Sequence, residues 1–111
     1  SRDRKKIFNL AAIDEGEEVR RSTAYHRNLL EADPSGEIIR QLAQDKNPKI
    51  RSIIASSNDL LKADPSGSLI IQLVNDENIL VKSKCAANKN IPPEYLTKIL
   101  MHIMNIVFNR T

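Results

Sequence analysis

The pentapeptide Ala-Asp-Pro-Ser-Gly occurs at residues 32–36 and again at 63–67, which are 31 positions apart. The same offset relates positions outside the pentapeptide. It takes Ile50 to Val81 in one direction and to Val19 in the other, so it connects three consecutive segments without a gap. A fixed period of about 20–50 residues is typical of an array of stacked structural units. The offset therefore predicts a repeat architecture, and it limits the fold more than any other feature of the chain.

The apolar residues of each segment follow the spacing of helices. In the middle segment Ile38 and Leu42 lie on one side of a helix, and Ile50 lies on the inner side of a second helix. Between the two helices Asn47 is expected to cap the second helix, with Pro48 as its first residue. Each segment is thus predicted to be a pair of helices joined by a short turn.

The pentapeptides are expected to start the first helix of a pair. Asp33 has a side chain that can accept hydrogen bonds from free backbone N–H groups, and Pro34 is tolerated at the first helical position. The second pentapeptide is expected to do the same in the third segment. The second helix of that segment is predicted to start at Asn75 or Asp76.

One helical pair of this length cannot bury its own apolar side, so neighbouring pairs must stack. Larger aliphatic residues at one repeated position are expected to fill the layer between pairs, and alanines at another are expected to let the second helices approach closely. These residues are Val19, Ile50 and Val81 at the first position and Ala24, Ala55 and Ala86 at the second.

The predicted fold is all-α, a right-handed α-α superhelix (solenoid) of about three helical pairs plus a long C-terminal helix. One domain covers residues 1–111, with repeats at about 6–31, 37–62 and 68–92. The final helix is predicted at about 93–108, and most of its residues from Tyr95 onward are apolar. This exceeds the stripe that one neighbouring pair can bury. Either the chain normally continues, or this helix meets another molecule.

An acidic residue precedes a basic one by six positions in every segment. The acid lies at the turn between the helices and the base lies one turn into the second helix. The acid can face the base of its own unit or that of the adjacent unit, which would form a ladder along the stack. The residues of this predicted structural ladder are Asp14, Arg20, Asp45, Arg51, Asp76 and Lys82. An Arg fork suits such a charge-assisted bond better than Lys82 does.

This pattern of Asp, then Val or Ile followed by Arg or Lys, then Ala resembles HEAT repeats and their relatives. The stretch 73–96 is more specifically similar to the leucine-rich repeat variant family. The resemblance covers most of residues 7–100 and implies an α-solenoid that presents a binding surface. The first two units depart from the family in being longer, by an inserted Leu-Leu-x-Ala-Asp-Pro-Ser-Gly. The chain has no cysteine cluster, so the iron–sulfur module of some variant-repeat proteins is not implied.

Composition favours a non-enzymatic protein of a reducing, cytoplasmic environment. Cys85 is the single cysteine and aligns with core positions, and neither His26 nor His102 belongs to a recognisable catalytic motif. No cofactor or metal is expected. The charged start lacks the apolar run of a signal peptide, and no apolar stretch reaches the roughly 18 residues of a membrane span.

Two functional classes remain. The first is a protein-interaction scaffold whose partner is a protein, including another copy of the chain, bound through the apolar tail at Tyr95, Ile99, Ile103, Ile106, Val107 and Phe108. The second is a nucleic-acid-binding array. The net charge of +3 is mild for that role, but stacked bases could meet regularly spaced phosphates. Its candidate contacts are Arg21, Arg27, Arg40, Lys49, Lys62, Lys84 and Lys89.

Overall fold

The computed structural model describes residues 2–26 and 29–109, without the side chains at 2, 96, 98–100, 102–103 and 106–107. Within these ranges every regular element is a helix and there is no strand. The molecule measures 49 × 24 × 22 Å along its principal axes. The predicted all-α class is therefore confirmed for the part of the chain that the structure describes.

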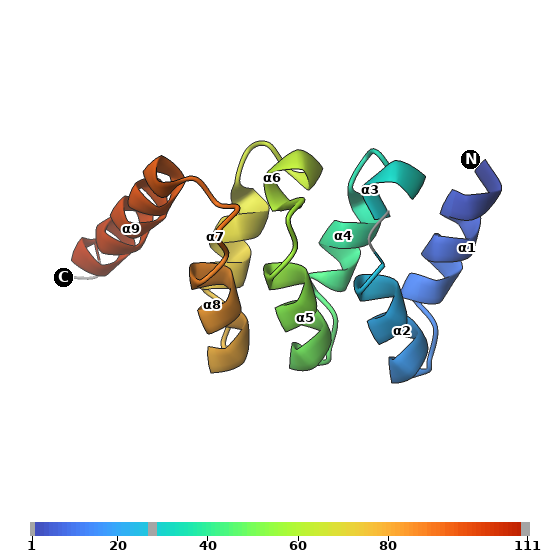
Figure 1. Ribbon diagram of the computed structural model, residues 1–111. Helices are drawn as coiled ribbons and strands as arrows, with labels where there is room; N and C mark the ends of the chain where they lie inside the picture. The colour runs from blue at the N-terminus through green and yellow to red at the C-terminus, as the bar shows by residue number, and fades with distance from the viewer. Residues whose placement is uncertain (1, 27–28, 110–111) are drawn as a thin grey trace.

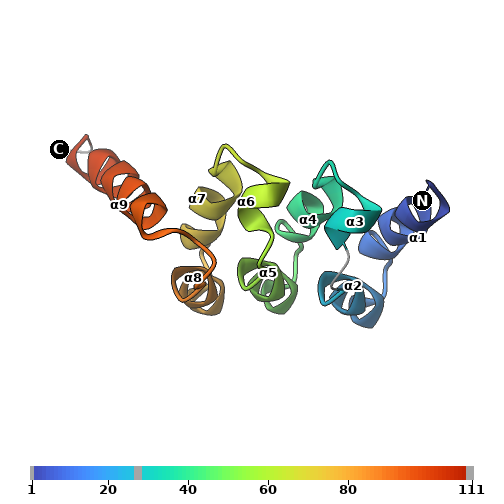
Figure 2. The ribbon, with the colours of Figure 1, turned by 45° about the horizontal axis from the view of Figure 1, so that its top comes forward.

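The helices lie in two rows, with two short helices across one edge. Figures 1 and 2 show α1, α4 and α7 side by side in one row, α2, α5 and α8 in a second row, and α3 and α6 across the top. The bounds are α1 (Arg2–Ala12), α2 (Glu17–Ala24), α3 (Leu29–Ala32), α4 (Glu37–Leu42), α5 (Pro48–Ala55), α6 (Leu60–Ala63), α7 (Ser68–Val74), α8 (Ile79–Ala86) and α9 (Pro93–Phe108). We call α1–α2, α4–α5 and α7–α8 the first, middle and third unit.

The apolar layer between the two rows forms the core. Ile38 and Leu42 on α4 are fully buried, as is Ile50 on α5. The offset of 31 takes Ile38 and Leu42 to Leu69 and Leu73 on α7, which are also buried. Burial of one such side chain stabilises the fold by about 1.5–3 kcal/mol. With 4% aromatic residues in the chain, aliphatic packing supplies most of this core.

The predicted cap of α5 is confirmed. The Asn47 side chain accepts a hydrogen bond from the backbone N–H of Lys49 at 2.9 Å, and Pro48 is the first helical residue. The predicted start of α8 at Asn75 or Asp76 is wrong. Its N-cap is Asn78, because the Asp76 side chain accepts the N–H of Asn78 and holds the chain in a turn until that residue.

The first pentapeptide forms the turn before α4, and the prediction for it is confirmed only in part. Asp33 does satisfy a free N–H of α4, since its carboxylate accepts from Ile38 N at 2.9 Å. However, Pro34 is not the first helical residue: it lies in a turn, and α4 begins after Gly36. Gly36 has φ 76°, and a Cβ there would lie 2.6 Å from the carbonyl oxygen of Ala63. The turn is thus shaped by close contact with the end of α6 as well as by helix capping.

The sequence inserted before each pentapeptide forms a short helix that was not predicted as an element. These are α3 and α6, each of four residues. Their buried apolar residues are Leu29 and Ala32 in α3 and Leu60 and Ala63 in α6. Each short helix lies between two units (Figure 2). Leu29 and Leu60 belong to the same core cluster as the residues of the longer helices.

Two of the predicted interior residues are exposed because they lie at the ends of the stack. Val19 is 42% exposed, whereas Ile50 and Val81 are fully buried at the same repeated position. Val19 was expected to fill a layer between pairs, but the described chain has no unit before α2 to make that layer. Ala86 is exposed in the third unit for the same reason, since no further helical pair lies against α8 in the described residues, and Ala55 at the equivalent position is fully buried.

The long C-terminal helix is confirmed with the predicted bounds, α9 from Pro93 to Phe108. Tyr95 joins its first turn to the third unit: its hydroxyl donates to the carbonyl of Pro65 at 3.5 Å. The ring lies against Gly67, where a Cβ would overlap it. Across the described residues, no helix combines the length and apolar character needed to cross a membrane.

Candidate functional site

The Asp–Arg ladder connects each unit to the next one. Arg20 on α2 donates from Nε to Oδ2 of Asp45 at 2.8 Å and from Nη2 to Oδ1 at 3.4 Å. Its remaining Nη1 donates to the backbone carbonyls of Asp14 and Glu15, at 2.9 and 3.1 Å. The guanidinium therefore holds the turn of its own unit through the backbone and the following unit through a carboxylate.

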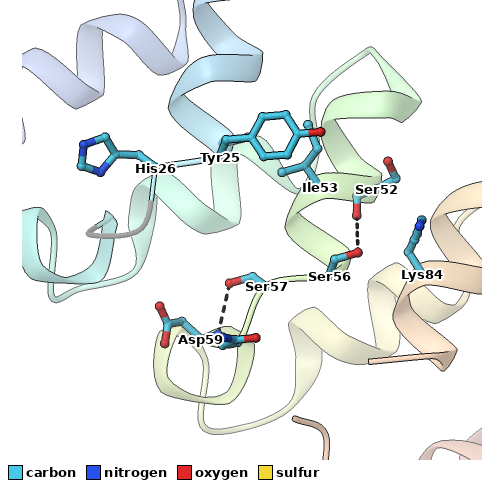
Figure 3. A pocket seen from close by; sticks show the side chains of 10 residues that line it. Tyr25, His26, Ser52, Ile53, Ser56, Ser57, Asp59 and Lys84 are labelled. Carbon is cyan, nitrogen blue, oxygen red and sulfur yellow. Dashed lines mark hydrogen bonds between the residues drawn. The ribbon is translucent and has the colours of Figure 1, made fainter. Parts of the chain in front are cut away.

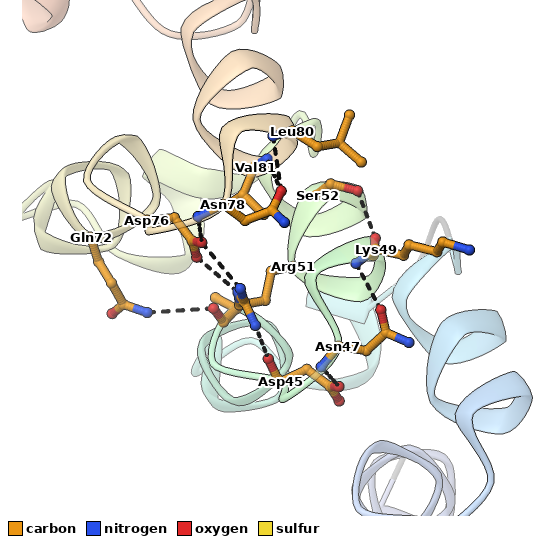
Figure 4. Close-up of polar contacts among 11 residues, drawn as sticks. Asp45, Asn47, Lys49, Arg51, Ser52, Gln72, Asp76, Asn78, Leu80 and Val81 are labelled. Carbon is orange, nitrogen blue, oxygen red and sulfur yellow. Dashed lines mark hydrogen bonds and ion pairs between the residues drawn. The ribbon is translucent and has the colours of Figure 1, made fainter.

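The same arrangement occurs one unit later (Figure 4). Arg51 on α5 donates to the two carboxylate oxygens of Asp76 at 2.8 and 3.1 Å and to the backbone carbonyl of Asp45 at 2.7 Å. The side chains of Arg51 and Asp76 are only 13% and 10% exposed. A planar guanidinium matches a carboxylate with two bonds, so these contacts fix geometry as well as charge.

Each acidic residue is also held by its own turn. One carboxylate oxygen accepts the N–H two residues later, which is Gly16 for Asp14, Asn47 for Asp45 and Asn78 for Asp76. For Asp45 and Asp76 the other oxygen accepts an arginine Nε–H from the preceding unit. Burial acts to raise the pKa of Asp76, but its hydrogen bonds from Arg51 and the Asn78 N–H outweigh burial and leave the pKa below its ordinary value of 3.8.

The structure decides the alternative that the sequence left open. The bases pair with the carboxylate of the following unit and not with that of their own unit. Four of the six predicted residues form two rungs: Arg20 with Asp45, and Arg51 with Asp76. Asp14 and Lys82 are exposed and form no ion pair with a described residue. They are the two ends of the ladder.

Other polar side chains also make contacts between units, and the sequence analysis did not identify Asn88 or Arg40 in this role. Asn88 is buried, and its amide donates to the carbonyls of Ala55 and Ser57 at 2.9 and 2.8 Å. Arg40 donates to the carbonyl of Ala63 at 3.0 Å. Neither residue recurs at the offset of 31, so periodicity alone could not have revealed them.

A hollow of about 690 Å³ runs over the ends of α2, α5 and α8. Figure 3 shows Tyr25 and His26 from the first unit on one side, three serines of the middle unit in the centre and Lys84 of the third unit on the other side. The Ser56 hydroxyl donates to the backbone carbonyl of Ser52 at 3.2 Å.

Exposed apolar residues are concentrated at the two ends of the stack. Ile7, Leu10 and Ile13 on and just after α1 are 65%, 60% and 61% exposed. At the other end Met101 and Met104 on α9 are 65% and 52% exposed. Large exposed apolar patches on a folded protein commonly mark sites of interaction with other molecules.

The predicted partner-binding residues of α9 are described only in part. Tyr95 is partly buried against the third unit, so it contributes to the core. Phe108 is 66% exposed. The side chains of Ile99, Ile103, Ile106 and Val107 lie outside the described part of the chain. The prediction that these four contact a partner remains a prediction.

The candidate nucleic-acid contacts are dispersed over several elements. Lys49, Lys84 and Lys89 are exposed, and Lys62 is exposed with Asp59 at 3.9 Å. Arg40 is occupied by backbone carbonyls, and Arg21 is partly buried on α2. Arg27 lies outside the described residues. The described bases do not repeat at the offset of 31, so they do not form one evenly spaced series along the stack.

The remaining reactive groups have structural explanations. Cys85 is 1% exposed, and burial raises the pKa of its thiol to about 11. A thiol that remains protonated at neutral pH is a poor nucleophile. The ring of His26 packs edge-on against Phe8, with centroids 4.5 Å apart.

Comparisons of this chain with protein-family models, with curated proteins and with solved structures gave no match.

Proposed function

We propose that the chain is a non-catalytic protein–protein interaction scaffold, built as a right-handed α-solenoid of HEAT-like repeats with a cytoplasmic location. The support for the architecture is the recurrence of the same contacts at the same offset. Arg20 bonds Asp45 and Arg51 bonds Asp76, each across 25 residues. Support for a scaffold comes from the use of these charged groups in joining units rather than in forming a reactive site.

The observation that carries the proposal is the exposure of apolar side chains at the ends of the stack. Ile7 is 65% exposed, whereas its equivalents Ile38 and Leu69 are at most 3% exposed. A repeat array normally closes its ends with polar faces. A face that keeps the composition of an internal junction, but remains exposed, is suited to bind another protein.

The tail at the other end supports self-association as one form of this function. In α9 the described Met101 and Met104 are exposed and three residues apart, so they share one side of the helix. An amphipathic helix of this kind is a common means of binding a complementary groove.

The proposal is tested by replacing the exposed residues of both ends. We expect Ile7→Glu with Leu10→Glu, or Met101→Lys with Met104→Lys, to weaken binding to a protein partner or to a second copy by at least about tenfold, as loss of buried apolar contacts does. Light scattering and affinity capture with purified components provide the readout. The control is Lys6→Glu with Asn105→Lys, which alters charge at exposed polar positions of the same helices. Equal binding by all variants would contradict the proposal.

Nucleic-acid binding is the alternative function. It is favoured by the exposed Lys84 and Lys89, which line neighbouring hollows over α8, and by the sequence pI of about 9.2. A mobility-shift titration at low and near-physiological salt separates the two functions. Binding that survives the higher salt, and that Lys84→Glu abolishes, would reverse the ranking.

A further inference from the structure

We infer that copies of this chain stack head to tail, with the α1–α2 end of one copy docked on the outer side of α8 of the next. This inference depends on the protein-binding function proposed above and names its partner as a second copy. In such a contact Lys82 of one copy would bond Asp14 of the other. Each contact would then continue the pairing that joins the units within a single chain.

The first argument is the exposed apolar surface at the N-terminal end. Between α1 and α2 lies an open hollow of about 460 Å³ whose apolar wall includes Ile7, Phe8 and Val19. In the middle unit the positions of Ile7 and Val19 are occupied by Ile38 and Ile50, which are fully buried against the preceding unit. The first unit therefore presents the apolar half of an internal junction without the other half.

The second argument is charge. Within the chain, the base of one unit always bonds the acid of the following unit. Asp14 is the acid with no preceding base, and Lys82 is the base with no following acid, in the described residues. The stretch 14–18 carries four acidic residues and no base, whereas the stretch 82–89 carries three lysines and no acid. These two stretches are therefore opposite in charge.

The third argument is that the outer side of α8 is open. Ile79 is 75% exposed, and Lys82 and Ala86 are also exposed, although α9 follows directly in the chain. Figure 2 shows α9 turning away from the two rows of helices beyond α8. A second copy could place α2 against α8 as α8 lies against α5, with the exposed Ile7 of its α1 facing α9.

A contact between two different faces does not close on itself, so copies would add one after another into open chains. The junction should be weaker than an internal one. Lys82 cannot form the two-bond contact that Arg20 and Arg51 form. Association is therefore expected to be reversible, to increase with concentration and to decrease with salt.

Sedimentation velocity of the full chain, from micromolar to millimolar concentration at low salt, tests this inference. We expect the wild type to grow in mass with concentration. Asp14→Lys alone and Lys82→Asp alone should each weaken association by at least about tenfold, because like charges then meet. The double variant, which exchanges the two charges, should restore it. Lys46→Asp, at an exposed position of the middle unit, is the control and should leave association unchanged.

A variant with increased affinity is a useful control, because misfolding cannot explain a gain in association. Lys82→Arg should tighten association by roughly threefold to tenfold, because the guanidinium can bond Asp14 as Arg20 bonds Asp45. A wild type that stays monomeric to millimolar concentration would overturn the inference, and so would a double variant as weak as the single ones. A monomeric chain that still binds a different protein through Ile7 and Leu10 would overturn the stacking while leaving the proposed function intact.

Discussion

The middle unit and the two outer units have the same sequence pattern but different surroundings. In the middle unit Asp45 receives a guanidinium from the first unit, and Arg51 gives one to the third. The first unit contributes only an arginine to the ladder and the third unit only an aspartate. Asp14 and Lys82 are therefore left exposed. The comparison shows that a repeated residue is buried or paired only where a neighbouring unit supplies the other half of the contact.

The largest difference in stability between equivalent substitutions in the middle and first units is expected in the apolar layer. Ile38→Ala should lower the free energy of unfolding by about 3–4 kcal/mol, because it removes a fully buried side chain and leaves a cavity. Ile7→Ala, the same substitution one unit earlier at a residue that is 65% exposed, should change it by less than about 0.5 kcal/mol. Urea unfolding followed by circular dichroism measures both. Equal effects would mean that the two positions are not equivalent parts of a stack.

The ladder provides the second comparison. Asp45→Ala should destabilise by about 3 kcal/mol, since it leaves the buried Arg20 charge without its carboxylate. Asp14→Ala removes only the hydrogen bond to Gly16 N, so we expect about 0.5–1 kcal/mol. The same unfolding experiment provides the readout, at low and high salt. A salt-sensitive loss at Asp14 as large as that at Asp45 would contradict the account.

Gly36 and Gly16 also differ in their surroundings, so the same substitution should have different effects on stability at the two positions. Gly36→Ala should destabilise by about 2 kcal/mol or more, because φ is 76° and the new Cβ would meet the backbone of Ala63 at the end of α6. Gly16→Ala should have a smaller effect, of about 0.5–1 kcal/mol, since φ is −76° and the nearest atom is a side-chain oxygen of Asp14. Melting temperatures of the two variants compare them directly. A milder effect at Gly36 than at Gly16 would disprove the close contact between units.

The smallest change in folding stability is expected on lowering the pH. The pKa of Asp76 is below its ordinary value, so its native state binds fewer protons than its unfolded state. The contribution of Asp76 is therefore present above about pH 4 and is lost as the pH falls through the lowered native pKa. Asp76→Asn should flatten the acid limb of the stability curve relative to the wild type. An unaltered acid limb in Asp76→Asn would argue against a rung at this position.

Much of the fold could be predicted from the sequence because the offset acts on residues that all units share. The spacing of the helical pairs, the Asn47 cap and the bounds of α9 follow from periodicity and local helix signals. The offset also takes Asn47 to Asn78, the true N-cap of α8. The prediction of Asn75 or Asp76 gave local preference more weight than the repeat.

The errors arise where a neighbouring unit decides the outcome. Pro34 is a good first helical residue in isolation, but the packing of Gly36 against Ala63 places it in a turn. Val19 is apolar like Ile50, and only the position of its unit in the stack leaves it exposed. The partner of Arg20 also depends on stacking geometry, which the six-residue spacing to Asp14 cannot specify.

A double-mutant cycle on Arg20 and Asp45 tests the central claim most directly. The claim is that a base bonds the acid of the following unit. We predict a coupling free energy of at least about 1.5 kcal/mol for Arg20→Ala with Asp45→Ala, because their side chains form a close and largely buried ion pair. The matched cycle of Arg20 with Asp14 should give a value near zero, since that contact is made by the Asp14 backbone carbonyl. Coupling confined to Arg20 and Asp14, with none to Asp45, would contradict the account.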